Sequence, residues 1–298
     1  MIVAAVDLGT NTTRLLVGRV DDGRVEELHR ETRITSLGEG VDARRRLLPV
    51  PIARVRNTLS DYRRIAESLE AERTLLVATS AVRDAENGEA FLGEIEWSYG
   101  FTTQLLSGDE EAELTRRGVG AVEPTTLLVD IGGGSTELVL GDFSTSLPLG
   151  SVRFTERHGD DVPASIEAAR ALLPGLEPRD AVGVAATITS LAALDLGLEE
   201  YDRKRVHGHV LTRDGARAQL ERLAALPLEE RRRVRALDPE RAPVIVAGAA
   251  ILVAILDTYG LEAIRVSERD LLDGTALAAA ELPEPEEGAA PPGAYTCC

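Results

Sequence analysis

Two short turns in this sequence combine an aspartate with glycine and hydroxyl residues, and they match each other at a spacing of 123 residues. The first runs from Asp7 to Thr12 (DLGTNT) and the second from Asp130 to Thr136 (DIGGGST). Glycine lets backbone N–H groups approach an anion without interference from a Cβ atom, and successive N–H groups form a concave anion site. The pattern therefore predicts two phosphate-binding turns, made by Gly9, Thr10, Asn11 and Thr12 and by Gly132, Gly133, Gly134, Ser135 and Thr136.

The two aspartates have a different task, because Asp7 and Asp130 would repel a phosphate. Mg²⁺ in proteins typically takes one or two carboxylates together with phosphate oxygens, so both aspartates are predicted to hold Mg²⁺ directly or through water. One glycine-rich turn alone could be a flexible hairpin, but two matching turns favour the functional interpretation. The chain contains no Gly-x-x-x-x-Gly-Lys segment, which excludes a P-loop NTPase.

The elements that must position these turns alternate between strand and helix patterns, which indicates an α/β fold. Ser107-Gly108-Asp109-Glu110 has the form of a capping box and predicts a helix start at Ser107. The apolar run 244–256 is shorter than the roughly 20 residues that span a bilayer, and is predicted to be a buried helix. Strands are expected at 2–7, 14–20, 25–30, 74–79, 104–106, 125–131, 136–140, 181–185 and 263–266, and further helices at 52–69, 81–91, 164–173, 188–194, 215–225 and in a last segment ending near 281.

The internal repeat predicts two similar lobes that face each other across a cleft. We place the N-terminal lobe at residues 1–123 and the C-terminal lobe at 124–281, and allow the last helix to pack back on the first lobe. Residues 282–298, with four prolines and three glutamates, are expected to form a disordered tail.

The amino-acid composition excludes several classes of partner and site. The 298 residues carry 33 basic and 50 acidic side chains, a net charge of −17, and only 3% aromatic residues. The acidic surplus argues against binding of double-stranded nucleic acid. The small number of aromatic residues argues against a surface on which single-stranded bases could stack. We therefore expect no nucleic-acid partner. The only cysteines, Cys297 and Cys298, cannot build a disulfide framework or a zinc site. Without a signal-like N-terminus or a membrane-length segment, we expect a cytoplasmic protein with no membrane partner.

Both turns resemble the phosphate motifs of the exopolyphosphatase / guanosine pentaphosphate phosphohydrolase (Ppx/GppA) family, which belongs to the actin, Hsp70 and sugar-kinase superfamily. Further segments match in family order: ATSAVR at 78–83, SGDEEA at 107–112, VSE at 266–268 and LDG at 272–274. The resemblance covers residues 3 to about 277 and is similar to the short, two-domain members. It implies two actin-like (ribonuclease H-like) α/β lobes with an interdomain cleft, Mg²⁺ as cofactor, polyphosphate or (p)ppGpp as substrate or ligand, and a homodimer.

The resemblance also assigns roles that spacing alone leaves open. Glu111 lies in the first turn of the predicted helix, where the helix dipole favours an ionised carboxylate, but a solvated glutamate is the simpler interpretation there. The family match makes Glu111 the general base. Arg83 follows a strand and matches a family arginine that would stabilise the transferring charge. Glu137 resembles a family acid near the metal.

The predicted activity is release of terminal orthophosphate from polyphosphate by in-line attack of water, assisted by Mg²⁺. Three alternatives stay open. Conversion of pppGpp to ppGpp uses the same chemistry, although few aromatics disfavour a stacked guanine. A kinase of the same superfamily would need an adenosine pocket, which Ala185–Ala186 does not suggest. A non-catalytic sensor of ppGpp or polyphosphate would have little use for the three carboxylates Asp7, Asp130 and Glu111.

Several other features depart from the family pattern or are weak. Ala186 stands where relatives commonly have glycine near the anion, and Pro243 stands where they often carry aspartate. His207 and His209 would share one face of a strand but have no clustered partner for a metal. Ser107 and Ser135 lack a His/Asp pair for covalent catalysis. Three basic runs, 44–46, 203–205 and 231–235, usually form solvated faces, and one of them could guide a polyanion.

Overall fold

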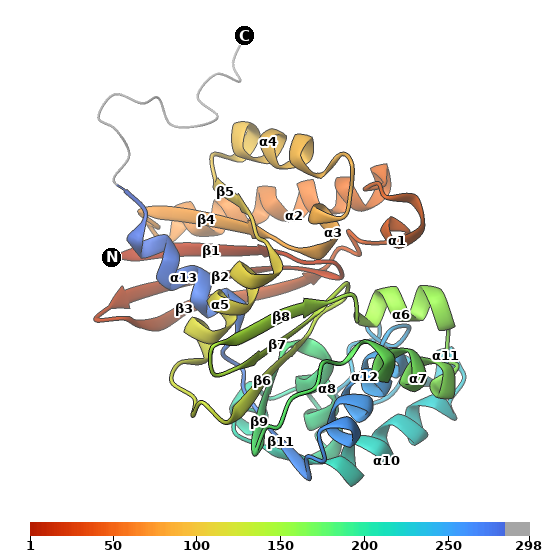
Figure 1. The fold of residues 1–298 in the computed structure, drawn as a ribbon. Helices are drawn as coiled ribbons and strands as arrows, with labels where there is room; N and C mark the ends of the chain where they lie inside the picture. The colour runs from red at the N-terminus through yellow and green to blue at the C-terminus, as the bar shows by residue number, and fades with distance from the viewer. Residues whose placement is uncertain (284–298) are drawn as a thin grey trace, which may run out of the picture. The chain divides into compact units, whose positions relative to one another are not determined.

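The computed structural model describes residues 1–283, and the chain falls into two compact units. Unit 1 comprises Met1–Val119 together with the chain from Leu271 onward, and unit 2 comprises Gly120–Asp270. Helix α13 (Leu271–Glu281) therefore belongs to the same unit as the N-terminal strands, beside strand β1 (Ile2–Leu8) (Figure 1). All but two residues of the predicted tail lie outside the described residues.

Unit 1 is built on a five-stranded mixed sheet of order β3-β2-β1-β4-β5. Strands β1, β2 (Thr12–Asp21) and β3 (Arg24–Ile34) are antiparallel neighbours. Strands β4 (Arg73–Ala78) and β5 (Thr102–Leu105) continue the sheet in parallel with β1. The helices of this unit are α1 (Val41–Arg44), α2 (Pro49–Ser68), α3 (Ser80–Arg83), α4 (Gly88–Tyr99), α5 (Gly108–Val119) and α13.

Alternation along β1 divides the core of unit 1 between the two faces of the sheet, as expected for successive strand residues. Ala4 and Val6 pack in the cluster that includes residues of α2 and α4. Val3 and Ala5 pack in the cluster that includes residues of α5 and α13. The sheet is thus covered by helices on both faces, and β1 is a central, buried strand.

Unit 2 has a six-stranded mixed sheet of order β10-β11-β9-β6-β7-β8. Its core centres on α12 (Ile245–Thr258), whose residues Ile245–Leu256 are all buried, so the predicted buried helix is confirmed. Within residues 1–283, no helix is both long enough and apolar enough to cross a bilayer. The remaining elements are β6 (Thr126–Ile131), β7 (Thr136–Leu140), β8 (Phe143–Leu147), β9 (Asp180–Val184), β10 (Val210–Thr212), β11 (Ala263–Val266), α6 (Ser151–His158), α7 (Val162–Leu172), α8 (Ala185–Asp195), α9 (Arg203–Val206), α10 (Arg213–Ala224) and α11 (Leu228–Arg231).

The two units repeat one topology, which confirms the internal repeat and the α/β class. Three antiparallel strands, β1-β2-β3 and β6-β7-β8, are each followed by a strand that lies parallel to the first of the three, β4 and β9. Even the turn geometry repeats, because Gly9 N donates to Thr12 O at 2.9 Å and Gly132 N donates to Ser135 O at 3.0 Å.

One fully buried arginine ties the loops of unit 2 together. The guanidinium of Arg231, 1% exposed, donates to the carbonyl oxygens of Leu223, Leu226 and Ala242 and to both oxygens of Asp160. These bonds fix the irregular segment that leads into α12.

Two local predictions were wrong, and two strands were missed. Residues 81–91 form two helices, α3 and α4, because the backbone turns so tightly that a Cβ at Gly88 would lie 2.0 Å from the carbonyl oxygen of Val82. Strands β8 and β10 went unpredicted, since one is rich in serine and threonine and the other has three residues. His207 and His209 do not share a strand, because Gly208 between them takes a φ of +83° and β10 begins only at Val210.

Candidate functional site

The site of unit 1 lies where the parallel strands β1, β4 and β5 end, which is where α/β sheets usually bind ligands. The turn Gly9–Thr12 follows β1, and its carbonyl groups are held by the segment after β3. Thr35 N and Ser36 N donate to Asn11 O at 3.0 and 2.9 Å, and Gly38 N donates to Thr10 O at 2.8 Å. The carbonyls of this turn are therefore directed to protein partners.

The turn Gly132–Ser135 of unit 2 is held in the same way by the start of α6. Ser151 N donates to Gly132 O at 3.0 Å, and Val152 N donates to Gly133 O at 2.8 Å. The side chain of Arg153 adds a bond from Nε to Gly134 O at 2.7 Å. The glycine turn thus caps α6, which has no side-chain cap of its own.

Anchored carbonyls leave the amide groups of both turns for another partner. Within residues 1–283, the N–H groups of Thr10, Asn11, Gly133, Gly134 and Ser135 donate to no protein group. Backbone amides gathered in a turn form an anion site. The geometry of both turns therefore fits the predicted phosphate binding.

The hydroxyl of Thr136 has a structural partner. Thr136 is fully buried, and its Oγ1 donates to Leu149 O, the residue before the glycine that precedes α6. Its counterpart Thr13 bonds to the Thr35 hydroxyl at 2.9 Å. Tyr62, buried beneath, donates to Thr13 O at 2.9 Å, and burial raises its pKa. These contacts fix the residue that follows each turn, Thr13 in unit 1 and Thr136 in unit 2.

Cross-strand partners give the two aspartates different surroundings. In unit 1, Asp7 is opposite Arg14, and Asp7 Oδ2 accepts from Arg14 Nε at 2.8 Å with Nη2 at 2.7 Å. In unit 2, Asp130 is opposite Glu137, and both residues are more than nine-tenths buried. Glu137 Oε1 also accepts from Ser146 Oγ at 2.6 Å. Two buried carboxylates at directly opposed positions, whose Cβ atoms are typically about 5 Å apart, suit a divalent cation.

The predicted base and the predicted arginine contact each other. Arg83 Nη1 donates to Glu111 Oε2 at 3.1 Å and to Leu106 O at 2.7 Å. Leu106 N in turn donates to Ala78 O at the end of β4. Both side chains are thereby positioned at the same strand ends as the turn Gly9–Thr12.

The capping box that positions Glu111 is confirmed. Glu110 N donates to Ser107 Oγ at 3.3 Å, and Ser107 N donates to Glu110 Oε2 at 2.7 Å. The bonds that Ser107 N and Ser107 Oγ donate to Glu110 Oε2 hold the pKa of Glu110 below its usual range. Glu110 is therefore occupied by the cap, whereas Glu111 is buried and turned toward Arg83.

Sequence reasoning missed Arg14, Ser146 and Gly150. A pairing rule could have found Arg14, because a hairpin with Gly9–Thr12 as its turn puts residues 7 and 14 opposite each other. Nothing local signals Gly150: its φ of −134° suits any residue, but a Cβ there would lie 2.2 Å from Gly133 O. Ala186 is the residue that stands where relatives commonly have glycine. The residue with a left-handed backbone is instead its neighbour Ala185, whose φ is +64°.

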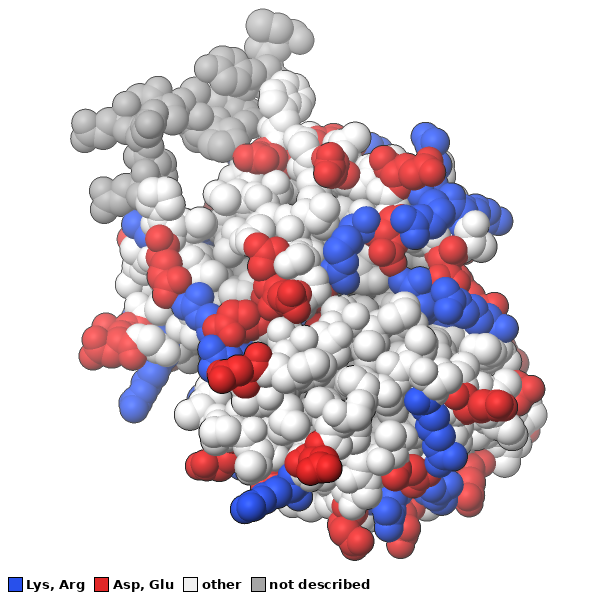
Figure 2. All heavy atoms as spheres, in the orientation of Figure 1, with Lys and Arg blue, Asp and Glu red and all other residues white. Residues whose placement is uncertain are grey.

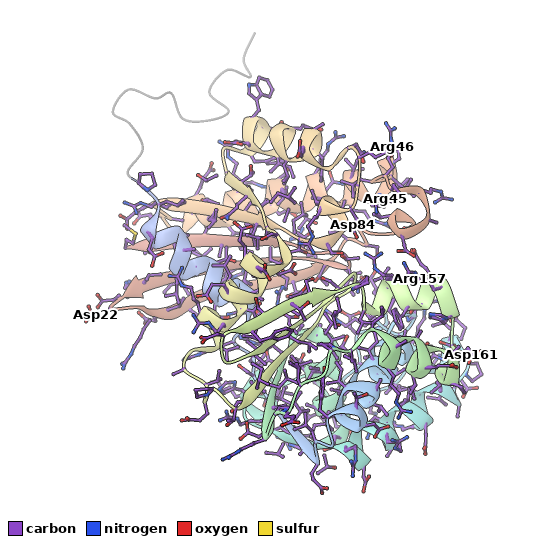
Figure 3. All side chains as sticks on the ribbon, in the orientation of Figure 1. Asp22, Arg45, Arg46, Asp84, Arg157 and Asp161 are labelled. Carbon is purple, nitrogen blue, oxygen red and sulfur yellow. The ribbon has the colours of Figure 1, made fainter. Side chains whose placement is uncertain are left out.

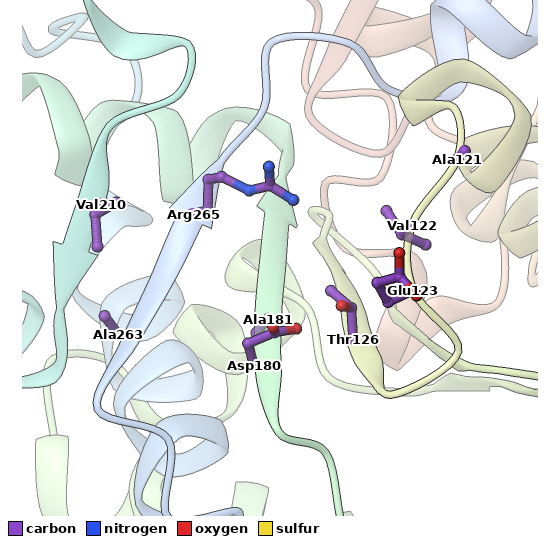
Figure 4. A pocket seen from close by; sticks show the side chains of 9 residues that line it. All are labelled: Ala121, Val122, Glu123, Thr126, Asp180, Ala181, Val210, Ala263 and Arg265. Atoms are coloured by element: carbon purple, nitrogen blue, oxygen red, sulfur yellow. The ribbon is translucent and has the colours of Figure 1, made fainter.

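A separate hollow lies at the opposite, N-terminal ends of strands β6, β9 and β11 in unit 2 (Figure 4). Its volume is about 530 Å³, and it mixes two carboxylates with one guanidinium among small apolar side chains. The lining residues are Ala121, Val122, Glu123, Thr126, Asp180, Ala181, Val210, Ala263 and Arg265. None of the predicted site residues lines it.

Comparison with known proteins identifies relatives across nearly the whole chain. The Ppx/GppA phosphatase family model matches residues 16–281. "Exopolyphosphatase 2" of Mycobacterium tuberculosis is 36% identical over 313 residues, covering 93% of this chain and 98% of the relative. A guanosine-5'-triphosphate,3'-diphosphate pyrophosphatase of Vibrio vulnificus is 31% identical, covering 92% and 58%. The crystal structure of an exopolyphosphatase-like protein aligns with a TM-score of 0.86 at 30% identity, covering 93% and 98%.

Proposed function

Because this chain belongs to the Ppx/GppA phosphatase family, we propose that it is an exopolyphosphatase that releases the terminal orthophosphate of inorganic polyphosphate. The observation that carries the proposal is the Arg83–Glu111 pair, 3.1 Å apart at the strand ends that also present the turn Gly9–Thr12. A carboxylate, a guanidinium and phosphate-binding amides on one edge of one unit are the groups that hydrolysis of a phosphoanhydride needs.

In this proposal Glu111 takes a proton from the attacking water. The water oxygen bonds to the terminal phosphorus as the P–O bond to the rest of the chain breaks, and the shortened polyphosphate leaves with the bridging oxygen. Arg83 donates to phosphate oxygens and offsets the charge of the transferring group. The amides of Thr10 and Asn11, and those of Gly133, Gly134 and Ser135, bind phosphate oxygens.

Mg²⁺ would bind first at Asp130 and Glu137, whose opposed carboxylates fit the ion. Two carboxylates together with substrate oxygens are a usual ligand set for Mg²⁺. Within residues 1–283 no cluster of three or more metal-binding side chains occurs, so phosphate oxygens of the substrate would have to supply the remaining ligands. When bound, the ion would neutralise phosphate charge. Because Asp7 already binds the guanidinium of Arg14, we propose that Asp7 contacts the ion through a water molecule and not directly.

Replacement of the base tests the proposal. Glu111→Gln should lower the rate of phosphate release from long-chain polyphosphate by about 10²–10⁴-fold, the usual contribution of a general base. Glu110→Gln is the matched control, because it removes a neighbouring carboxylate that serves the helix cap, and should keep most of the activity. If Glu111→Gln hydrolyses polyphosphate as fast as the parent, the assignment is wrong.

The relatives favour one second candidate, the hydrolysis of pppGpp to ppGpp, because some carry that activity in their names. The same residues would serve. A panel of long polyphosphate, tripolyphosphate, pppGpp and ATP, each with Mg²⁺ and with a chelator, separates the candidates by kcat/KM. Transfer of phosphate from ATP to an acceptor would favour a kinase, and binding without turnover would favour a sensor.

The proposal also includes a homodimer in the cytoplasm. Size-exclusion chromatography with light scattering measures the mass in solution, for which the 31.9 kDa chain gives the monomer value. A monomeric mass under all conditions would refute the dimer.

A further inference from the structure

Most arginines in this acidic protein have a carboxylate partner, and the basic run Arg44–Arg46 is an exception. In the other two runs the pairs are Arg203–Glu268, Arg231–Asp160, Arg232–Glu229 and Arg235–Glu199, whereas no carboxylate of residues 1–283 pairs with Lys204, Arg205 or Arg233. Arg44, Arg45 and Arg46 are all exposed, and no carboxylate of residues 1–283 lies within 4 Å of their charged groups. Of the three basic runs, 44–46 is thus the one in which no member pairs with a carboxylate of residues 1–283, so its three guanidinium groups can all bind an anion.

The run follows directly on the segment that holds the phosphate turn of unit 1. Gly38 N donates to Thr10 O, Val41 N donates to Gly38 O, and α1, which begins at Val41, ends at Arg44. Arg44 therefore lies six positions after Gly38, the residue that bonds to Thr10. Figure 3 labels Arg45 and Arg46 at one edge of unit 1, and Figure 2 shows blue spheres, with red ones among them, over this edge.

The backbone presents these side chains from a fixed position. Arg45 O accepts from Glu86 N at 2.8 Å, and Asn87 bonds both Leu47 N and Leu47 O, at 2.8 and 3.1 Å. Arg45 itself ends α1 with a φ of 55°, a left-handed conformation in which glycine is strongly preferred.

We propose that Arg44, Arg45 and Arg46 form a subsite for the inner phosphates of inorganic polyphosphate, beyond the terminal phosphate that is hydrolysed. This inference rests on the proposed function and adds a preference for long chains to it. A polyanion reaches all three arginines at once, whereas tripolyphosphate occupies only the region of the turn.

Kinetics with two charge-matched variants test the subsite. The triple variant Arg44→Gln, Arg45→Gln, Arg46→Gln should raise KM for long-chain polyphosphate about tenfold, since three exposed ion pairs each contribute a few-fold. Its kcat, and KM for tripolyphosphate, should change less than twofold. The control variant Arg24→Gln, Lys204→Gln, Arg205→Gln also loses three exposed cations and should leave all these values unchanged. Equal effects of the two variants, or equal effects on both substrates, would overturn the subsite.

Direct binding separates the failure of the subsite from the failure of the proposed function. In a Glu111→Gln background, where turnover is slowed about 10²–10⁴-fold, the salt dependence of long-chain polyphosphate binding should become shallower by about two units of log K per log [salt] when the three arginines are replaced. An unchanged slope refutes the subsite even if the parent hydrolyses polyphosphate. A parent that binds long chains through these arginines but releases no phosphate refutes the proposed function alone.

The single variant Arg45→Gly distinguishes a ligand-binding role from a structural one. Glycine relieves the left-handed backbone, so the Tm should stay the same or rise, while KM for long-chain polyphosphate rises a few-fold. A lower Tm together with an unchanged KM would show that Arg45 serves only the fold.

Discussion

Replacement of Gly150 by alanine should disable the glycine turn of unit 2 without changing any group that contacts substrate. Gly150 precedes α6 in an extended conformation that any residue can adopt, so its backbone does not require glycine. An added Cβ would lie 2.2 Å from Gly133 O and 2.4 Å from Gly134 C, both backbone atoms, whereas ordinary contacts begin near 3.4 Å. The turn and the start of α6 must therefore separate by about 1 Å.

That displacement determines the size of the effect. It stretches the bonds from Ser151 N to Gly132 O and from Val152 N to Gly133 O, which aim the amides of the turn. A misplacement of about 1 Å in a positioning group costs on the order of 10²-fold in rate, equivalent to about 2.7 kcal/mol. Strain of this kind also lowers stability by about 1–3 kcal/mol.

The assay is phosphate release from polyphosphate, reported as kcat/KM, with urea unfolding measured on the same preparation. Gly175→Ala is the control in the same unit, because a Cβ at Gly175 meets nothing within 4 Å. A folded Gly150→Ala protein with kcat/KM within twofold of the parent would show that the position of the glycine turn does not matter for the reaction.

Two further predictions concern stability in unit 2. Arg231→Met should lower the free energy of unfolding by about 3–5 kcal/mol in urea titrations, because several buried carbonyls lose their donor; a loss below about 1 kcal/mol would contradict this account. Ala185→Gly should raise the free energy of unfolding by about 0.5 kcal/mol, since the relief of a φ of +64° exceeds the entropy cost of glycine. A decrease in stability for Ala185→Gly would mean that the left-handed backbone there carries no strain.

Much of the fold and part of the site follow from local pattern. Alternating apolar residues, the duplicated Asp-x-Gly turns and the Ser107–Glu110 box each act over a few residues, so they remain readable without knowledge of distant contacts. The buried helix predicted at 244–256, which is observed at Ile245–Thr258, follows in the same way from one continuous apolar run.

Tertiary structure decided what each of these residues contacts. Asp7 and Asp130 are equivalent in sequence, but one faces Arg14 and the other faces Glu137 across its hairpin. The turn carbonyls find donors in segments about 20 residues away, and only close packing explains Gly150. Whether an arginine run is neutralised or left without a carboxylate also depends on which side chains the fold brings within 4 Å. Periodicity records the preferences of neighbours along the chain, whereas steric contact and charge pairing depend on distances in space that no local pattern encodes.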